Sequence, residues 1–211
     1  ITYPRQILYL KSVINLLKSD SKYHNNKLIN YFNKTFNKKF KVKNMLPISQ
    51  GRFGIFLSCR EAIKNKKKEI LMSPFTIFDL VNMVLCANGK PIFCDIAKNS
   101  NHLTLKNIRS KVNRNTAALI LTHYETINPE MDKIYSFCKK KKIILINDLA
   151  ISIDSKYKKK NLSKFSDFSI FSFGFYKFSS SILGGGLYVK NQQIYRKLHK
   201  ELLRYKTYKF S

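Results

Sequence analysis

Short apolar runs alternate with stretches of helical periodicity along most of this 211-residue chain. The apolar runs predict strands at 45–48, 69–72, 91–94, 117–121 and 142–146. Between them, apolar residues recur at helical spacing over 53–65, 76–87, 104–112 and 130–140. Strands separated by helices of this length indicate βαβ crossovers and a mostly parallel sheet that is covered on both faces. We therefore predict the α/β class, in the form of a three-layer αβα sandwich.

The first 45 residues have a different texture and are rich in Lys and Asn. Their apolar positions predict two amphipathic helices that pack on the main body, through Ile7, Leu10, Val13, Ile14, Leu17, Leu28, Ile29, Phe32 and Phe36. We divide the chain accordingly into an N-terminal helical segment, residues 1–45, and a main domain, residues 46–211. The chain begins at Ile1 instead of Met and stops at Ser211 directly after a helical stretch, so we expect it to be a piece of a longer protein.

Residues 167–190 contain an unusual lysine between two predicted strands. The segment DFSIFSF alternates polar and apolar residues and predicts a half-buried strand, and Gly184-Gly185-Gly186 leads into a second strand at Leu187–Val189. Lys177 lies between them in FGFYKFSSSIL, among aromatic and hydroxyl side chains. Apolar surroundings destabilise the charged form of a lysine and expose its nucleophilic amine, as Schiff-base chemistry requires. The alternative is a loop lysine that extends its ammonium group to water.

The net charge of +28 arises from 40 Lys and Arg against 12 Asp and Glu, a balance typical of proteins that bind nucleic acid or anionic membranes. The lysine runs, however, are spread over the chain at 66–68, 139–142 and 158–160 instead of gathering on one element. Lysine together with abundant Asn and Ile is also what an AT-rich genome encodes at permissive surface positions. We therefore expect neither a nucleic-acid nor a membrane partner.

The cysteines and histidines are dispersed. None of the four cysteines forms a metal-ligand or redox spacing, and we expect reduced thiols in a cytoplasmic protein; they are Cys59, Cys86, Cys94 and Cys138. The four histidines are equally scattered, so no metal site is predicted. No apolar run approaches the 18 residues of a membrane-spanning helix.

Candidate binding residues lie where predicted strands end, because ligands of parallel α/β sheets bind outside the carboxyl ends of the strands. Gly51-Arg52-Phe53-Gly54 opens the first crossover helix, whose N-terminal amides and dipole favour an anion; the alternative is a simple strand-to-helix turn. Asp148 follows the apolar run 143–146, where a desolvated carboxylate needs a cation to remain ionised. A structural cap of the next turn explains Asp148 equally well.

Together these features are the parts needed to hold pyridoxal phosphate: an anion cradle, a strand-end Asp, and Ser172 five residues before Lys177. The chain resembles the DegT/StrS-like sugar aminotransferases, which are fold-type I pyridoxal phosphate-dependent enzymes. The resemblance runs from about Leu46 to Val189, over GRFGIFLSCREAI, SPFTIFDLVNMVLCANGKPIFCDI, LILTH, NPEMDKI, IILINDLA and FSDFSIFSFGFYKFSSSILGGGLYV.

The resemblance implies a role for each site residue. Lys177 is similar to the Schiff-base lysine and the catalytic residue, and Asp148 to the partner of the pyridine nitrogen. Ser172 is similar to the phosphate-binding serine, and Gly51 with Arg52 occupies the phosphate-loop position. The resemblance thus assigns cofactor binding to all five residues and implies that residues 46–211 are the large domain of a fold-type I aminotransferase whose small C-terminal domain is missing.

Several positions depart from the family pattern. Gln50-Gly51-Arg52 replaces Ser-Gly-Thr, so a hydroxyl ligand of the phosphate is missing. Ile151 replaces a Gln or His that lies near the cofactor ring, and Ile77 replaces the aromatic residue that stacks on it, a role for which Phe75 or Phe78 could substitute. His123 begins a weak match to the HxYG segment and fits a pocket residue or a core histidine equally well.

The resemblance implies a transaminase that moves an amino group from an amino acid, such as glutamate, to a keto sugar, for the most part nucleotide-linked, in surface-polysaccharide or amino-sugar biosynthesis. It also implies a homodimer with a site completed across the subunit interface. Two alternatives remain open: a degenerate family member that serves as a binding or regulatory module, and, from the charge alone, a nucleic-acid binder.

Overall fold

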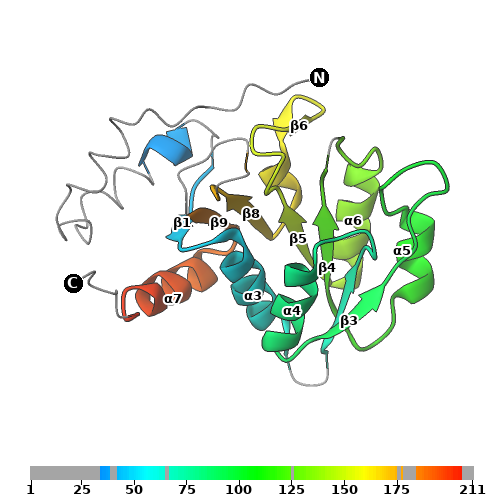
Figure 1. Cartoon of the computed structure of the whole chain (residues 1–211), viewed down its shortest axis with the longest axis horizontal. Coiled ribbons are helices and arrows are strands. Elements are labelled where there is room, and N and C mark those ends of the chain that lie inside the picture. Colours follow the sequence, from blue (N-terminus) through cyan, green and yellow to red (C-terminus); the bar gives the residue numbers. More distant parts are fainter. Residues whose placement is uncertain are drawn as a thin grey trace.

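The computed structural model describes residues 34–38, 42–64, 67–124, 126–174, 177 and 184–205, and these form a seven-stranded sheet between two layers of helices (Figure 1). The strands are β1 (Met45–Ile48), β2 (Glu69–Met72), β3 (Lys90–Phe93), β4 (Thr116–Thr122), β5 (Ile144–Asp148), β8 (Phe168–Ser172) and β9 (Gly185–Val189). Their order in the sheet is β1-β9-β8-β5-β4-β2-β3. The five strands from β8 to β3 are parallel, whereas β9 is antiparallel to both of its neighbours. The prediction of a mostly parallel α/β sheet is confirmed.

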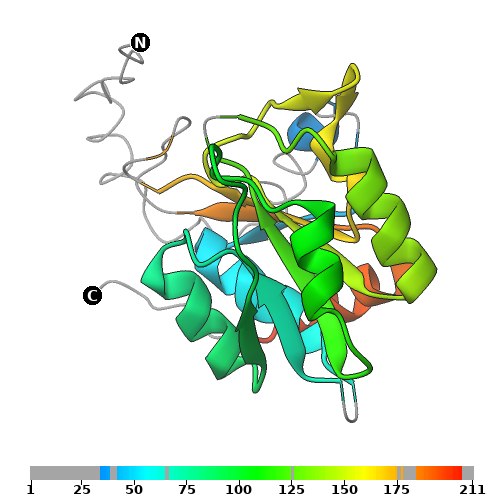
Figure 2. The same ribbon diagram turned by 90° about the vertical axis from the view of Figure 1, so that its right-hand side faces the viewer.

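Helices cover both faces of the sheet, as Figure 2 shows from the side. One face carries α3 (Gly51–Ala62), α4 (Phe78–Cys86) and α7 (Gln192–Leu202); the other carries α5 (Leu105–Lys111) and α6 (Met131–Lys141). Each face buries its own apolar cluster, because the inner strands point large side chains to both sides, as Ile120 and Leu119 do. The buried apolar layers therefore hold the strand ends, and with them the candidate site, in fixed positions.

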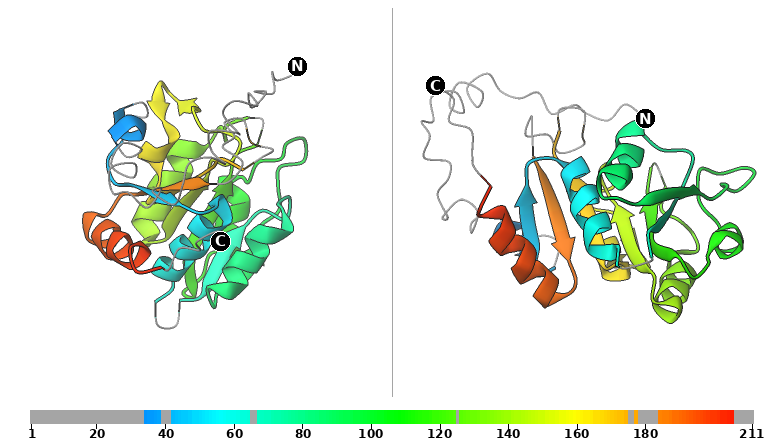
Figure 3. Two further views of the ribbon diagram at one scale, coloured as in Figure 1. Left: turned by 60° about the vertical axis from the view of Figure 1, so that its left-hand side comes forward. Right: turned by 90° about the horizontal axis from the view of Figure 1, so that it is seen from below.

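The C-terminal helix α7 lies on the same face as α3 and beside β9 (Figure 3). Arg60 of α3 forms a bidentate ion pair with Glu201 of α7, with N···O distances of 2.8 and 2.7 Å. Lys197 of α7 binds Glu61 at 2.8 Å. These pairs connect the last helix to the helix that opens at Gly51.

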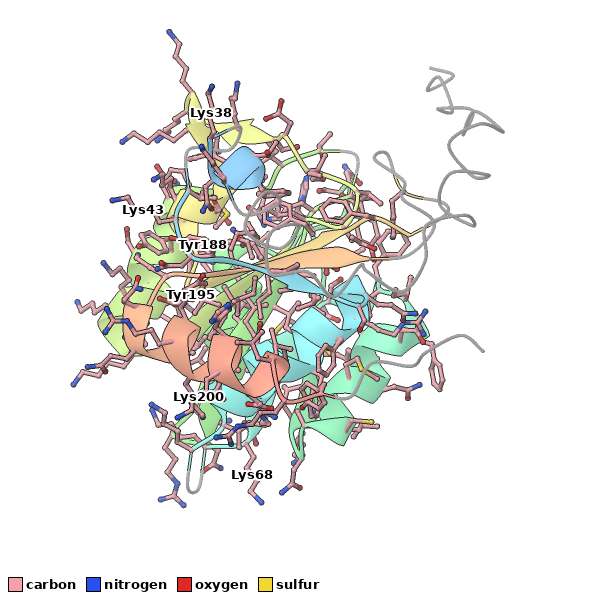
Figure 4. The ribbon with its side chains drawn as sticks, turned by 90° about the vertical axis from the view of Figure 1, so that its left-hand side faces the viewer. Lys38, Lys43, Lys68, Tyr188, Tyr195 and Lys200 are labelled. Carbon is pink, nitrogen blue, oxygen red and sulfur yellow. The ribbon has the colours of Figure 1, made fainter. Side chains whose placement is uncertain are left out.

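The positive charge on this side of the molecule is spread out. In Figure 4 the labelled lysines come from separate parts of the chain, namely Lys38, Lys43 before β1, Lys68 before β2 and Lys200 on α7. No helix among the described residues is long and apolar enough to cross a membrane. In the same part of the chain no three His, Cys, Asp or Glu side chains group as metal ligands, and the four cysteines are free thiols.

The N-terminal segment was predicted to pack on the main domain through two helices, most of whose residues lie outside those that the structure describes. Residues 34–38 are helical, and Phe36 is buried with its ring centroid 5.1 Å from that of Phe171 on β8. The division at residue 45 stays a prediction.

Two strand predictions need correction. The strand at 167–173 was predicted to be half-buried, but β8 lies between β5 and β9, and its first four residues are buried on both faces. Its polar Ser169 is accommodated because its hydroxyl lies 2.7 Å from that of Ser166. The strand predicted at 142–146 is displaced by two residues, because Lys142 ends α6 with a left-handed backbone (φ 54°) and β5 runs from Ile144 to Asp148.

A small hairpin after β5 was not predicted. Strands β6 (Lys156–Tyr157) and β7 (Lys160–Asn161) pair through a turn in which Lys158 and Lys159 have positive φ, and a short 3-10 helix η2 (Leu162–Phe165) follows. Lysines are uncommon at positive φ, so the composition of this segment gave no turn signal.

Candidate functional site

A cavity of about 380 Å³ opens at the carboxyl ends of β5 and β8, beside the N-terminus of α3. All five site residues predicted from the sequence line it: Gly51, Arg52, Asp148, Ser172 and Lys177. The other described residues of its wall are Gln50, Ile55, Ile77, Asp79, Leu80, Ala150, Ile170, Gly174 and Gly184. Its volume lies within the range of small-molecule sites. The structure thus brings together site residues from three separate segments, 51–52, 148 and 172–177, while their individual roles remain predictions.

The N-terminus of α3 forms one wall of the cavity and is free of side-chain caps. Gln50, the N-cap residue, makes no side-chain hydrogen bond to the helix, and the first turn carries no acidic residue. A Cβ atom at Gly51 would lie 3.0 Å from Cβ and 3.3 Å from Oγ of Ser172, so glycine keeps this corner open. Uncapped amides and the helix dipole favour an anion at this place.

Close backbone packing holds this corner in shape. A Cβ atom at Gly185 on β9 would lie 2.8 Å from the carbonyl oxygen of Phe171 and 2.9 Å from the amide nitrogen of Gly51. Because only glycine permits this approach, β9 and the start of α3 meet directly behind Ser172. Ser172 is the one hydroxyl among the described residues of the cavity wall.

Asp148 is the last residue of β5 and is buried, with 5% of its surface exposed. Its Oδ1 accepts a hydrogen bond from the backbone N–H of Ala150 at 3.0 Å. Burial raises the pKa of the Asp148 carboxyl, while the Ala150 hydrogen bond and the charge of Lys177 act in the opposite direction. The ionised carboxylate is therefore disfavoured, and a cation bound in the cavity would stabilise it.

Lys177 lines the cavity and is half-buried. Its backbone N–H donates to the carbonyl oxygen of Gly174 at 2.9 Å. The aromatic and hydroxyl neighbours that singled it out in the sequence occupy 175–176 and 178–183, outside the described residues. The structure therefore places the lysine in the same cavity wall as Asp148 without describing the loop around it.

The positions that depart from the family pattern differ in whether they line the cavity. Ile77 does line the cavity, with 54% of its surface exposed. Phe75 and Phe78 do not line it; the Phe75 ring packs against Tyr124 with centroids 5.0 Å apart, so neither residue takes the place of Ile77. Ile151 is also outside the wall and is 41% exposed, whereas its neighbour Ala150 lines the cavity.

His123 follows β4 and is completely buried outside the cavity wall. Its Nε2 lies 3.4 Å from Oδ1 of Asn147, and its Nδ1 has no hydrogen-bond partner. Burial lowers the pKa of the imidazole to about 4. Of the two interpretations open from the sequence, the structure supports a core histidine.

Asp79 is a residue of the cavity that was not predicted. It lies in the first turn of α4, and its Oδ2 is 2.9 Å from the Nη1 atom of Arg52. An acidic residue in the first turn of a helix is common for electrostatic reasons alone, so its sequence position carried no separate signal.

Comparison with known proteins places this site in a family. Residues 8–208 match the model of the DegT/DnrJ/EryC1/StrS aminotransferase family. The chain belongs to this family. The match extends beyond the stretch, about Leu46 to Val189, on which the resemblance rested.

Individual relatives agree with the family. The chain is 32% identical to UDP-4-amino-4,6-dideoxy-N-acetyl-beta-L-altrosamine transaminase of Campylobacter jejuni over 68% of its length and 38% of that protein's. It is 26% identical to GDP-perosamine synthase of Vibrio cholerae, over 80% of its length and 46% of the relative's. Among solved structures, PseC of Helicobacter pylori, an aminotransferase involved in the biosynthesis of pseudaminic acid, superposes with a TM-score of 0.81 at 22% identity, over 95% and 55% of the two chains. The chain thus spans about half the length of its relatives, and the fold is that of the fold-type I large domain.

Pyridoxal phosphate is the cofactor of this family. The cavity fits it on three observations: an uncapped helix N-terminus that a Cβ at Gly51 would fill, a buried carboxylate at Asp148 whose pKa is raised by burial, and a lysine in the same wall. These supply a place for a phosphate, for a protonated pyridine nitrogen and for an aldehyde, respectively.

Proposed function

We propose that the complete protein is a pyridoxal phosphate-dependent transaminase that transfers an amino group from an amino acid, such as glutamate, to a keto sugar carried on a nucleotide. The observation that supports this best is the cavity in which Lys177, Asp148 and Ser172 meet the N-terminus of α3. The names of the relatives, a UDP-sugar transaminase and a GDP-perosamine synthase, support the nucleotide-sugar substrate class. Spore coat polysaccharide biosynthesis protein SpsC of Bacillus subtilis, another relative, supports a place in surface-polysaccharide synthesis.

Each residue has a defined task in this proposal. Pyridoxal phosphate supplies an aldehyde that condenses with amines and a ring that accepts electrons from the reacting carbon. Asp148 holds a proton on the pyridine nitrogen, and in return the pyridinium charge stabilises its carboxylate. Ser172 Oγ and the amides of α3 hold the phosphate. Lys177 Nζ would hold the aldehyde, and as a general base and acid it would move the proton at the α-carbon of the donor.

We further propose that the complete protein is a homodimer. Phe75 and Ile77 in the loop before α4, and Phe78 at its first position, are exposed, with 52, 54 and 76% of their surfaces accessible. Such a cluster of apolar side chains is typical of a contact surface. Sedimentation of the complete protein tests this: a Phe78→Asp variant should dissociate, and an exclusively monomeric wild type would contradict it.

Borohydride trapping of the cofactor tests the function directly. The complete protein, loaded with pyridoxal phosphate and reduced, should carry a stable adduct that peptide mass spectrometry locates on Lys177. Lys177→Ala should carry none, while Lys200→Ala, an exposed lysine on α7, should retain it. A loaded wild-type protein without an adduct on Lys177 would refute the proposal.

Addition of the amino donor alone separates an enzyme from a degenerate binding module. In the enzyme, glutamate added before the reduction should release the cofactor from Lys177, so that borohydride no longer links the two. A binding module should keep the linkage. A degenerate member was suggested by Ile151 and by the weak HxYG segment that begins at His123. Neither residue lines the cavity, which favours the enzyme.

A further inference from the structure

Arg52 and Asp79 join the N-termini of two helices across the cavity. Arg52 is the second residue of α3 and Asp79 is the second residue of α4, and both line the cavity wall. Their contact is a single Nη1–Oδ2 pair at 2.9 Å. It thus uses one corner of a guanidinium group that carries five N–H donors.

This ion pair is weakly held. The two side chains are 51% and 36% exposed, and exposed pairs of this kind contribute little to stability. By contrast, guanidinium binds phosphate through two parallel charge-assisted hydrogen bonds, which are stronger. A dianion at the start of α3 would therefore compete well with Asp79 for Arg52.

The phosphate position needs an additional ligand. Gln50 gives no side-chain hydrogen bond to the helix end, and Ser172 is the one hydroxyl among the described wall residues. Arg52 directly follows Gly51, whose missing Cβ forms the cradle. The described wall carries two positive side chains, Arg52 and Lys177. Arg52 is next to the cradle in sequence, whereas Lys177 comes from the loop after β8.

We propose that Arg52 is a ligand of the cofactor phosphate and that Asp79 is its alternative partner, which holds the guanidinium at the cavity while the phosphate is absent. This inference rests on the proposed function. Asp79 keeps a favourable position after Arg52 leaves it, because a carboxylate in the first turn of α4 interacts with the positive end of that helix. Exchange of partners therefore costs little, and Asp79 lowers phosphate affinity by competition.

Titration of the complete apoprotein with pyridoxal phosphate, followed by absorbance, tests the exchange. Arg52→Gln should weaken binding about tenfold, a change of about 1.4 kcal/mol, and Arg52→Lys should lie between it and wild type because a lysine keeps the charge without the fork. Asp79→Asn should tighten binding about threefold. Arg114→Gln serves as the matched control, because Arg114 is exposed in the turn before β4, at the amino end of that strand, and changes the net charge equally.

The double variant distinguishes exchange from simple repulsion between Asp79 and the phosphate. If Asp79 acts by competing for Arg52, the gain from Asp79→Asn should largely disappear in the Arg52→Gln background. An undiminished gain in that background overturns the role of Asp79. Equal losses from Arg52→Gln and Arg114→Gln, or losses from both Arg52→Gln and Asp79→Asn, overturn the proposal as a whole and leave a structural ion pair.

A second titration with inorganic phosphate, followed by thermal unfolding, keeps this inference separate from the proposed function. Phosphate should raise the unfolding temperature of the wild type and Arg114→Gln, and raise that of Arg52→Gln less. If wild type formed no adduct on Lys177 but this pattern held, the function would fail and the anion site would stand. An equal shift in Arg52→Gln refutes the anion site even in a protein that binds the cofactor.

Discussion

The cavity at the end of β5 and the closed core at the end of β4 each contain a buried titratable side chain, with opposite consequences. Asp148 and His123 are adjacent, since the backbone N–H of His123 donates to the carbonyl oxygen of Asp148 at 3.2 Å. Burial acts against the charged form of both, raising the pKa of Asp148 and lowering that of His123 to about 4. Asp148, however, faces a cavity that a cation can enter, whereas His123 lies outside the cavity wall, with its Nε2 3.4 Å from Oδ1 of Asn147.

The difference shows what an opening does to a buried charge. In the cavity, a desolvated carboxylate favours the binding of a cationic ligand, because the ligand provides the electrostatic stabilisation that water no longer provides. In the closed core the cost of desolvation remains as a loss of stability at low pH. Four variants test this comparison.

Asp148→Asn should separate function from stability most strongly. Loss of the carboxylate should lower transamination by at least about a thousandfold, equal to about 4 kcal/mol of barrier, because nothing else holds the proton on the ring nitrogen. The apoprotein should be as stable as wild type or more stable at neutral pH, since a desolvated charge is removed. Kinetics and thermal unfolding of the apoprotein measure the two effects, and a clearly destabilised apoprotein would argue against an uncompensated carboxylate.

His123 should make the protein sensitive to acid. Its folded pKa lies below its unfolded value of about 6.5, so the unfolded state binds the proton first and stability falls as pH decreases from about 6.5 to 4. The shift corresponds to a loss of about 3 kcal/mol over this window. Urea unfolding at several pH values should show this component in wild type and not in His123→Gln. Parallel curves for the two proteins would contradict the closed core.

Gly185→Ala should affect both regions through the backbone. A Cβ there meets main-chain atoms of Phe171 and Gly51 within 3 Å, which cannot move aside as a flexible side chain can. We expect a loss of about 2 kcal/mol in stability together with weaker phosphate binding. Gly174→Ala is the matched control, because its added Cβ would meet no described atom closer than 3.8 Å. Denaturant midpoints of the two variants should differ clearly, and equal midpoints would rule out the close packing behind Ser172.

Ile151→Gln should have the smallest effect. The side chain is 41% exposed and lies outside the cavity wall, so stability should change by less than about 0.5 kcal/mol. Cofactor affinity should remain within about twofold of wild type. A large gain in affinity would show that this position reaches the cofactor in the loaded protein.

The sequence predicted the sheet well because buried parallel strands are short apolar runs, and Met45–Ile48 and Glu69–Met72 were located to the residue. It misjudged β8, since Ser169 looks solvent-facing by alternation, and only the tertiary structure supplies Ser166 as its partner. The β6–β7 hairpin was not predicted, because the residues of its turn with positive φ are lysines, which give no turn signal.

The candidate site was accessible for a similar reason. Gly51, Asp148 and Ser172 stand at strand ends or helix starts, which a parallel fold gathers at one edge. Residues whose position depends on a loop could not be placed in this way. Ile151 follows Asp148 by three residues yet is not part of the described wall. Asp79 is part of it because α4 begins beside α3.

The corner beside Gly51 is made of main-chain atoms, so the anion site there does not depend on one particular neighbouring side chain. A side-chain ligand is lost with one codon change, whereas every residue except proline carries an amide N–H. Positions 50 and 52 can therefore exchange hydroxyls for Gln and Arg while the helix end persists. The shape of this corner then depends on two residues without side chains, Gly51 and Gly185, whose absent Cβ atoms permit the close approach.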